Sequence, residues 1–169
     1  MLAFHCAAFV RRGEVMDALL FRTRVTALWL AVAIAATASF LLYVFMPGAL
    51  EELLAGEMEG EALTDANLFL LAAFMVIPLV MAVVALLVGD GVNRITNLIA
   101  GAAYGLFGVF AVVSHVLEGG FNVHVLMAAL GAAGALLIAG LSLAALQHPT
   151  SEPATPASGS SRPHEATTA

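Results

Sequence analysis

The chain has 169 residues, enough for one domain, and 62% of them are hydrophobic while 11% carry charge. Soluble domains are about half apolar and a quarter charged, so this excess predicts a protein that faces lipid. A formal net charge of -6 without a basic stripe disfavours nucleic acid as a partner, and the single cysteine, Cys6, excludes an intramolecular disulfide and a cysteine-rich metal site.

The first apolar run spans residues 25–46 and follows an arginine-containing segment, residues 1–24. The run is too long for the apolar core of a signal peptide, so we expect a retained membrane helix. Pro47 and Gly48 end this helix, because proline cannot continue the helical hydrogen-bond ladder and glycine accommodates the turn.

Residues 47–67 form an acidic loop with six carboxylates, Glu51 among them. Residues 50–58 set Leu50, Leu53 and Leu54 against acids, a spacing typical of a short amphipathic turn at the membrane interface. Thr64 or Asp65 is a candidate N-cap for the helix that follows.

An apolar hairpin occupies the middle of the chain, with no charged residue in 68–88 or in 95–117. A bilayer core of about 30 Å needs about 20 apolar residues in a helix, so each run can cross it. The six-residue turn 89–94 cannot carry the chain back across, so we expect the two helices to be antiparallel neighbours. Pro78 leaves one carbonyl without its helical donor, so we expect a kink there, packed against a neighbouring helix that satisfies the carbonyl.

A fourth apolar run, residues 121–146, follows the short turn at residues 118–120. The sequence therefore predicts an all-α fold, an integral membrane four-helix bundle over residues 25–146. Residues 147–169 are rich in Ser, Thr, Pro and Ala and cannot bury enough apolar surface to order themselves, so we expect a disordered tail.

The arginines predict the orientation. With four crossings, the N-terminal segment, the 89–94 turn and the tail share one side, and all six arginines fall in these three segments. The positive-inside rule makes that side cytoplasmic, with both termini inside and the acidic loop outside. The predicted location is the cell membrane, specifically a bacterial inner membrane, with lipid as a partner.

Ladders of small residues occur on three of the predicted helices, and small residues let helix backbones approach closely in lipid. The ladders are Ala27, Ala31, Ala35 and Ser39; Gly101, Gly105 and Gly108; and Ala128, Gly131, Gly134 and Ala135. Dimerisation is one interpretation. Packing within one bundle is favoured, because three helices carry such ladders.

His115, Glu118 and His124 flank the tight turn before the fourth helix and could converge. Two imidazoles and a carboxylate would suit zinc or another divalent metal, and two facing histidines could hold a haem. Their interfacial depth and the lack of a fourth ligand favour ordinary hydrogen bonding instead. We expect the two rings to point in different directions, with no cofactor and no catalytic residue.

Asn93 fits an N-cap for the third helix, and Arg94 fits an anchor on lipid phosphates. Few polar side chains lie at membrane depth, chiefly Asn97, Tyr104 and Ser114. A transport path would need several polar groups along a route across the membrane.

Several short motifs agree in order and spacing with a known pattern: Leu28-Trp29, Pro47-Gly48 before Leu50-Glu51-Glu52, Ile77-Pro78, and Asn93-Arg94-x-x-Asn97-x-x-x-Gly101. Over residues 23–146 the chain resembles an uncharacterised family of small bacterial four-helix membrane proteins, a domain of unknown function, and more distantly the DoxX-like membrane proteins. The resemblance implies an architecture and no reaction. It favours these motif positions over the histidines as places for function: Pro47, Gly48, Glu51, Pro78, Asn93, Arg94 and Asn97.

The sequence thus predicts a small non-enzymatic membrane protein that acts by helix-mediated association with itself or with another membrane protein. The alternatives are a membrane redox-associated, DoxX-like subunit and a small transporter.

Overall fold

The computed structural model describes residues 2–58 and 60–147, with side chains for residues 16–58, 60–117 and 120–147. The elements in this part of the chain are α1 (Leu2–Val44), α2 (Ala49–Leu54), β1 (Glu57–Met58), β2 (Glu61–Ala62), α3 (Asp65–Leu87), α4 (Asp90–Gly119) and α5 (Val123–Gln147). β1 and β2 form an antiparallel pair. The expected disordered tail lies outside the described residues from residue 148 onward.

Four of these helices are long and apolar enough to cross a membrane. The shortest, α3, has 23 residues. At 1.5 Å rise per residue this gives a length of about 35 Å, which exceeds a hydrocarbon core of about 30 Å. The expected all-α fold with four long apolar helices is confirmed.

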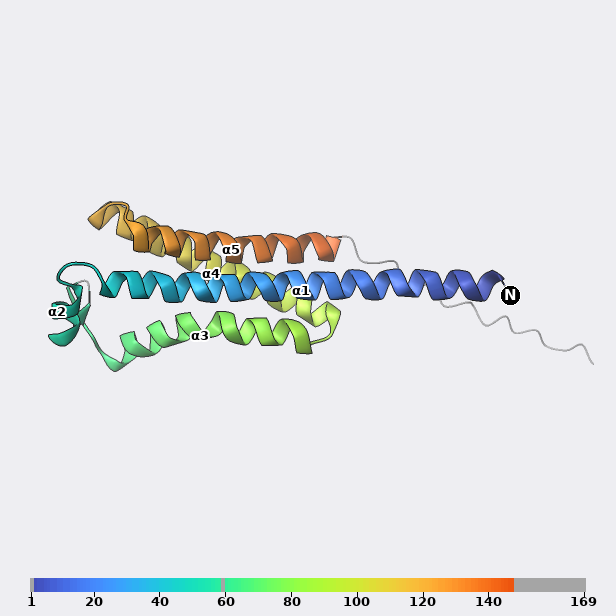
Figure 1. Cartoon of the computed structure of the whole chain (residues 1–169), viewed down its shortest axis with the longest axis horizontal. Helices are drawn as coiled ribbons and strands as arrows, with labels where there is room; N and C mark the ends of the chain where they lie inside the picture. Colours follow the sequence, from blue (N-terminus) through green and yellow to red (C-terminus); the bar gives the residue numbers. More distant parts are fainter. Residues whose placement is uncertain (1, 59, 148–169) are drawn as a thin grey trace, which may run out of the picture.

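The four long helices do not pack equally against one another. α1 lies between α5 and α3, and α4 packs along α5 (Figure 1). α3 and α4 touch far less, although only Val88 and Gly89 separate them in the chain. The two helices of the predicted hairpin, α3 and α4, therefore form the most loosely packed edge of the bundle, and α1 lies at the centre of the bundle. The reason is that the glycines of α4 face α5 and not α3.

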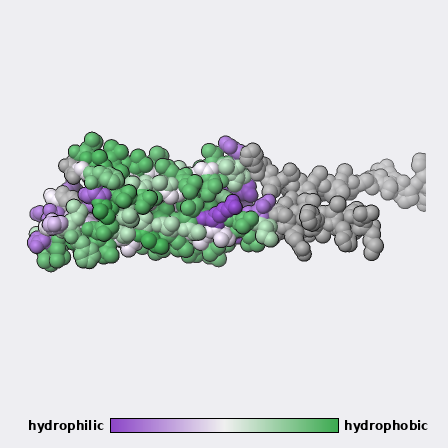
Figure 2. Space-filling model, turned by 45° about the horizontal axis from the view of Figure 1, so that its top comes forward, coloured by the Kyte–Doolittle hydropathy of each residue, from purple (hydrophilic) through white to green (hydrophobic). Residues whose placement is uncertain are grey.

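The bundle has two chemically different ends. We call one end the loop end; it holds α2, the β-hairpin and the α4–α5 turn. We call the opposite end the arginine end; it holds the α3–α4 turn and the last residues of α5, and it carries Arg22, Arg24 and Arg94. The N-terminal part of α1 extends past the bundle at the arginine end (Figure 1). Figure 2 shows apolar side chains over the flank and hydrophilic ones towards the two ends, as lipid contact requires.

The acidic loop is folded more extensively than its sequence suggests. Gly48 has φ 87°, a left-handed conformation that suits glycine and turns the chain from α1 into α2. The amphipathic turn ends at Leu54, before the β-hairpin. Thr64 is confirmed as the N-cap of α3, since its side chain accepts a hydrogen bond from the backbone N–H of Asn67 at 3.3 Å.

The start of α4 differs from the prediction. The helix begins at Asp90 with Gly89 as its N-cap residue, so the six-residue turn is mostly helical. The backbone N–H of Asn93 already donates to the carbonyl of Gly89 at 2.8 Å, which places Asn93 inside the first turn. The assignment of Asn93 as an N-cap was therefore wrong, and its side chain is available for other contacts.

The small residues of α4 pack inside the bundle. A Cβ at Gly101 would lie 2.8 Å from the backbone oxygen of Ala135, and a Cβ at Gly105 would lie 2.7 Å from the side chain of Leu136. On another face of α5, Gly131 lies against α1. Packing within one chain, the favoured interpretation of these ladders, is confirmed for α4 and α5.

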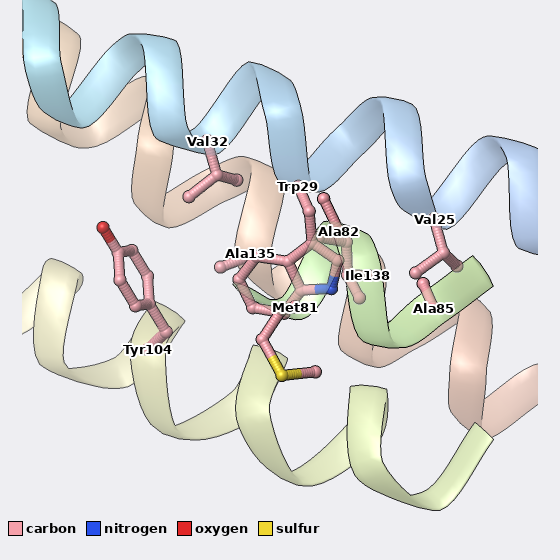
Figure 3. Packing of buried hydrophobic residues seen from close by; sticks show 9 residues of the cluster. All are labelled: Val25, Trp29, Val32, Met81, Ala82, Ala85, Tyr104, Ala135 and Ile138. Carbon is pink, nitrogen blue, oxygen red and sulfur yellow. The ribbon is translucent and has the colours of Figure 1, made fainter. Parts of the chain in front are cut away.

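The hydrophobic core gathers where α1 meets the other three long helices (Figure 3). It centres on Trp29, which is fully buried beside Ile138. Its members are Val25, Trp29 and Val32 of α1, Met81, Ala82 and Ala85 of α3, Tyr104 of α4, and Ala135 and Ile138 of α5.

Candidate functional site

A cavity of about 560 Å³ lies between α1, α3, α4 and α5, on the loop-end side of Tyr104. Trp29 and Ile138 do not line it, so the core closes it towards the arginine end. Six of the lining side chains are Phe or Tyr: Phe40, Tyr43, Phe74, Tyr104, Phe107 and Phe110. A few polar side chains interrupt the apolar lining: Ser39, Glu61, Asn67, Ser114, His115 and His124.

Stacked aromatic rings bridge α3 and α4 at the inner end of the cavity. Phe74 stacks on Tyr104 with ring centroids 4.4 Å apart and an interplanar angle of 12°. Phe74 also contacts Phe107, with centroids 5.7 Å apart. Long aromatic side chains thus bridge two backbones that do not approach closely, and space remains between them towards the loop end.

Pro78 explains why Tyr104 stands at this position. Proline has no N–H, so the carbonyl four residues earlier, that of Phe74, loses its helical donor. The Tyr104 hydroxyl donates to this carbonyl at 3.0 Å. The expectation that the freed carbonyl finds a partner on a neighbouring helix is confirmed, and this bond fixes the inner end of the cavity.

The two histidines meet at the loop end of the cavity. The rings of His115 and His124 contact edge to face, with centroids 5.5 Å apart. The two side chains therefore lie side by side, and the expectation that their rings point in different directions stays a prediction, because the contact gives the separation of the ring centroids and an interplanar angle of 76°. Gly120, with φ 79°, allows the reversal between α4 and α5, and the hydroxyl of Ser39 donates to the backbone carbonyl of His124 at 2.9 Å, which fixes the start of α5 against α1.

Two residues that the sequence reasoning missed, Met46 and Tyr43, lie beside His124. His124 Nδ1 lies 3.1 Å from the sulfur of Met46, and its ring lies edge to face with that of Tyr43, centroids 6.0 Å apart. The Tyr43 hydroxyl donates to a carboxylate oxygen of Glu52 at 3.1 Å. Met46 lies beyond Val44, the last residue of α1, so no helical spacing in the sequence could have shown its contact with His124.

Glu118, the third metal candidate, has its side chain outside the described part of the structure. Among the described residues, no three His, Cys, Asp or Glu side chains lie close enough to hold a metal ion. Of the acidic motif, Glu51 is exposed, and the adjacent Glu52 makes the contact with Tyr43.

Asn93 and Asn97 form a buried polar chain nearer the arginine end. The Trp29 indole N–H donates to Asn97 Oδ1 at 2.6 Å. The Asn97 amide donates to Asn93 Oδ1 at 2.6 Å and to the Asn93 carbonyl at 2.8 Å. The Asn93 amide in turn donates to the carbonyl of Ala85 at 3.0 Å. This chain satisfies a carbonyl in the last turn of α3 and joins α1, α3 and α4.

Two arginines satisfy other helix ends. Arg22 donates to the carbonyl of Leu86 at 3.0 Å and forms a salt bridge with Asp90 at 2.7 Å. Arg94 donates to the carbonyl of Ala145 at 2.7 Å, close to the end of α5. Basic groups near helix C-termini are favourable because the exposed carbonyls carry partial negative charge. One donor of the Arg94 guanidinium is therefore held by α5, and the contact of Arg94 with lipid phosphates stays a prediction.

The motif positions and the cavity thus have different roles. Asn93 and Asn97 join helices through buried hydrogen bonds and Arg94 through a partly buried one, and Pro78 frees the carbonyl that Tyr104 bonds. The histidine pair and the aromatic rings line the cavity. The polar side chains that a bound ligand could contact lie at the loop end.

Four long apolar helices with this packing define a multi-pass membrane protein built as a helical bundle. Residues 20–149 match the model of a family of unknown function, DUF6326. The chain belongs to this family, which confirms the resemblance to an uncharacterised family; the distant DoxX-like relation stays a prediction. No curated protein and no solved structure matches the chain.

Proposed function

We propose that this protein is a non-enzymatic membrane binding protein for an amphipathic, lipid-like small molecule. The observation that carries the proposal is the cavity of about 560 Å³ between α1, α3, α4 and α5. Ligand pockets typically have volumes of about 300–1,000 Å³, an apolar wall and a few placed polar groups.

The distribution of polar groups defines the class of ligand. Phe74, Tyr104 and Phe107 at the inner end offer only ring faces and edges, because the Tyr104 hydroxyl is engaged with the Phe74 carbonyl. His115 and His124 lie at the loop end. A molecule with an apolar body and one polar group fits this polarity, with its polar group beside the histidines.

The loosely packed α3–α4 edge supplies a route from the bilayer. The backbones of the two helices rarely approach closely, and the rings of Phe74, Tyr104 and Phe107 bridge them beside the cavity. A lipid-soluble ligand then needs no aqueous path, and rotation of a few side chains opens the edge.

The proposal includes an orientation in the cell membrane. The arginine end faces the cytoplasm with both termini, and the acidic loop end faces outward, as the positive-inside rule requires of Arg22, Arg24 and Arg94. Reporter fusions after Arg94 and after Leu146 are expected to report cytoplasm, and a fusion within residues 57–61 to report the outside. A cytoplasmic signal from residues 57–61 contradicts the orientation.

Helix-mediated association is a second candidate, now confined to one surface. Ala27 and Ala31 of the α1 ladder are exposed, whereas the glycines of α4 are occupied by α5. A second copy would pack on this face of α1, and replacing both alanines by leucine would then reduce the oligomer mass in detergent. A transporter would need the core around Trp29 to open, and a redox role would need a cofactor in the cavity.

Photolabelling tests the binding proposal. Membranes that contain the protein are irradiated with a diazirine-bearing hexadecanoic acid, and labelled peptides are mapped by mass spectrometry. Labelling is expected on cavity-lining segments of α3 and α4. Ala111→Trp, which fills the cavity from α4, is expected to abolish this labelling. Ala103→Trp, on the exposed face of the same helix, is the matched control.

Equal labelling of both tryptophan variants and the wild type contradicts the proposal. Labelling confined to exposed positions of the helices contradicts it as well, since contact with bulk lipid explains such a pattern.

A further inference from the structure

We propose that the ligand of the cavity carries a cationic ammonium head group, which binds at Glu61 on the loop end. The inference rests on the proposed function, because it names the head group of the amphipathic molecule that the cavity would hold. The observation that carries it is the charge of the wall. Among the described residues that line the cavity, Glu61 is the only Asp, Glu, Lys or Arg.

The β-hairpin places Glu61 at the wall of the cavity. Met58 and Glu61 are paired residues of β1 and β2, and both line the cavity. Gly60, with φ 77°, makes the turn between the strands, and the backbone N–H of Leu63 donates to the carbonyl of Gly56 at 2.7 Å, which closes the hairpin. The position of the Glu61 carboxylate is therefore set by the fold of the acidic loop.

Hydrogen-bond acceptors face a ligand from this part of the wall. Among the described residues, no group donates a hydrogen bond to the Glu61 carboxylate or forms a salt bridge with it. Asn67, which also lines the cavity, donates through its side-chain amide to the carbonyl of Ala62 at 3.2 Å, and its Oδ1 can only accept. An ammonium group has donors and no acceptor, so it complements both side chains.

The charge of the loop end favours a cation over an anion. Residues 25–93 and 95–147 contain no Lys or Arg, so the described part of the loop end has neither. The helix termini do not offset the acids, because α3 and α5 begin at this end whereas α1 and α4 end there, and their opposite partial charges offset one another. An anionic head group is therefore repelled at the loop end, and a cationic one is attracted. The acids described there are Glu51, Glu52, Glu57, Glu61 and Asp65.

Two hydroxyl groups of the wall are engaged as donors elsewhere. The Tyr43 hydroxyl donates to Glu52 at 3.1 Å, and the Ser39 hydroxyl donates to the backbone carbonyl of His124 at 2.9 Å. Neither hydroxyl hydrogen is available to an anionic head group. The ring of Tyr43 lies beside His124 and lines the cavity, and an aromatic face attracts a cation within about 6 Å of its centroid.

Three photoprobes that share a diazirine-bearing hexadecyl chain test the head group: an ammonium, a hydroxyl and a carboxylate. The full-length protein is placed in phosphatidylcholine vesicles at pH 8, where an alkylammonium keeps its charge. Labelling of cavity-lining segments is divided by labelling of exposed helix positions, which removes differences in membrane partition. The ammonium probe is expected to label the cavity about threefold more than the hydroxyl probe, as an exposed ion pair allows, and the carboxylate probe is expected to label it least.

A pair of charge-neutralising variants locates the effect. Glu61→Gln is expected to remove the preference for the ammonium probe over the hydroxyl probe. Glu51→Gln is the matched control and is expected to keep this preference, because Glu51 is an exposed acid of α2 that does not line the cavity.

The outcomes separate this inference from the proposed function. Equal cavity labelling by the ammonium and hydroxyl probes, or an unchanged preference in Glu61→Gln, overturns the ammonium head group and leaves the binding proposal in place. Absence of cavity labelling by all three probes overturns the binding proposal, and the head group with it.

Discussion

Replacement of Asn97 by leucine is expected to destabilise the bundle more than any exposed polar substitution. Asn97 is fully buried, accepts from the Trp29 indole and donates twice to Asn93. Leucine has the same branching and the same number of side-chain heavy atoms as asparagine, so the loss comes from hydrogen bonding and not from a void. It adds little apolar gain, because lipid is as apolar as the bundle interior.

The magnitude follows from the groups that lose their partners. The Trp29 N–H and Asn93 Oδ1 are both left without Asn97, and a buried unsatisfied group costs about 1–3 kcal/mol. Side-chain hydrogen bonds in a membrane protein average about 0.6 kcal/mol, so three bonds give about 2 kcal/mol. Two such groups give about 2–6 kcal/mol, so the two estimates meet at a loss of about 2 kcal/mol in the free energy of unfolding.

The assay is unfolding in mixed micelles of a mild detergent and SDS. Asn67→Leu is the matched control, because the Asn67 amide donates to the Ala62 carbonyl at an exposed position. A double-mutant cycle of Asn97→Leu with Trp29→Phe isolates the indole–amide bond and is expected to give about 1 kcal/mol of coupling. Equal stability of Asn97→Leu and Asn67→Leu, or no coupling, would refute the reasoning.

Two further predictions concern helix packing, measured in the same assay. Gly101→Ala is expected to cost about 1–3 kcal/mol and to cost more than Gly105→Ala, because the methyl group at position 101 meets the backbone of α5, whereas the one at position 105 meets mainly a leucine side chain. Gly140→Ala is the control, because there is open space around Gly140. Equal losses of stability at all three sites contradict this packing. Tyr104→Phe is expected to cost about 1–2 kcal/mol of stability. Adding Pro78→Ala is expected to recover part of this loss, because alanine restores a backbone N–H for the Phe74 carbonyl. Strictly additive effects of the two substitutions contradict this coupling.

The fold was predictable because its determinants are local. Uninterrupted apolar runs give four helices, since a bilayer rewards any helix of sufficient length. Thr64 caps α3 through a residue three positions away, and Pro78 frees a carbonyl four positions back. Contacts of this range follow from the spacing of residues in one helix.

The site was less predictable because its determinants join distant segments. Trp29 and Asn97 are 68 positions apart, and Met46 and His124 are 78 apart. No periodicity within one helix reports which helix lies beside it. The sequence placed α3 and α4 together through their short turn, whereas the glycines of α4 direct that helix onto α5 and leave the cavity at the other edge.

The central claim is that the cavity holds a lipid-like molecule, and native mass spectrometry of the protein released from its own membrane tests it most directly. A single bound molecule is expected on the wild type and on Ala103→Trp, and none on Ala111→Trp. Equal occupancy of all three proteins, or no bound molecule on any of them, would contradict the account.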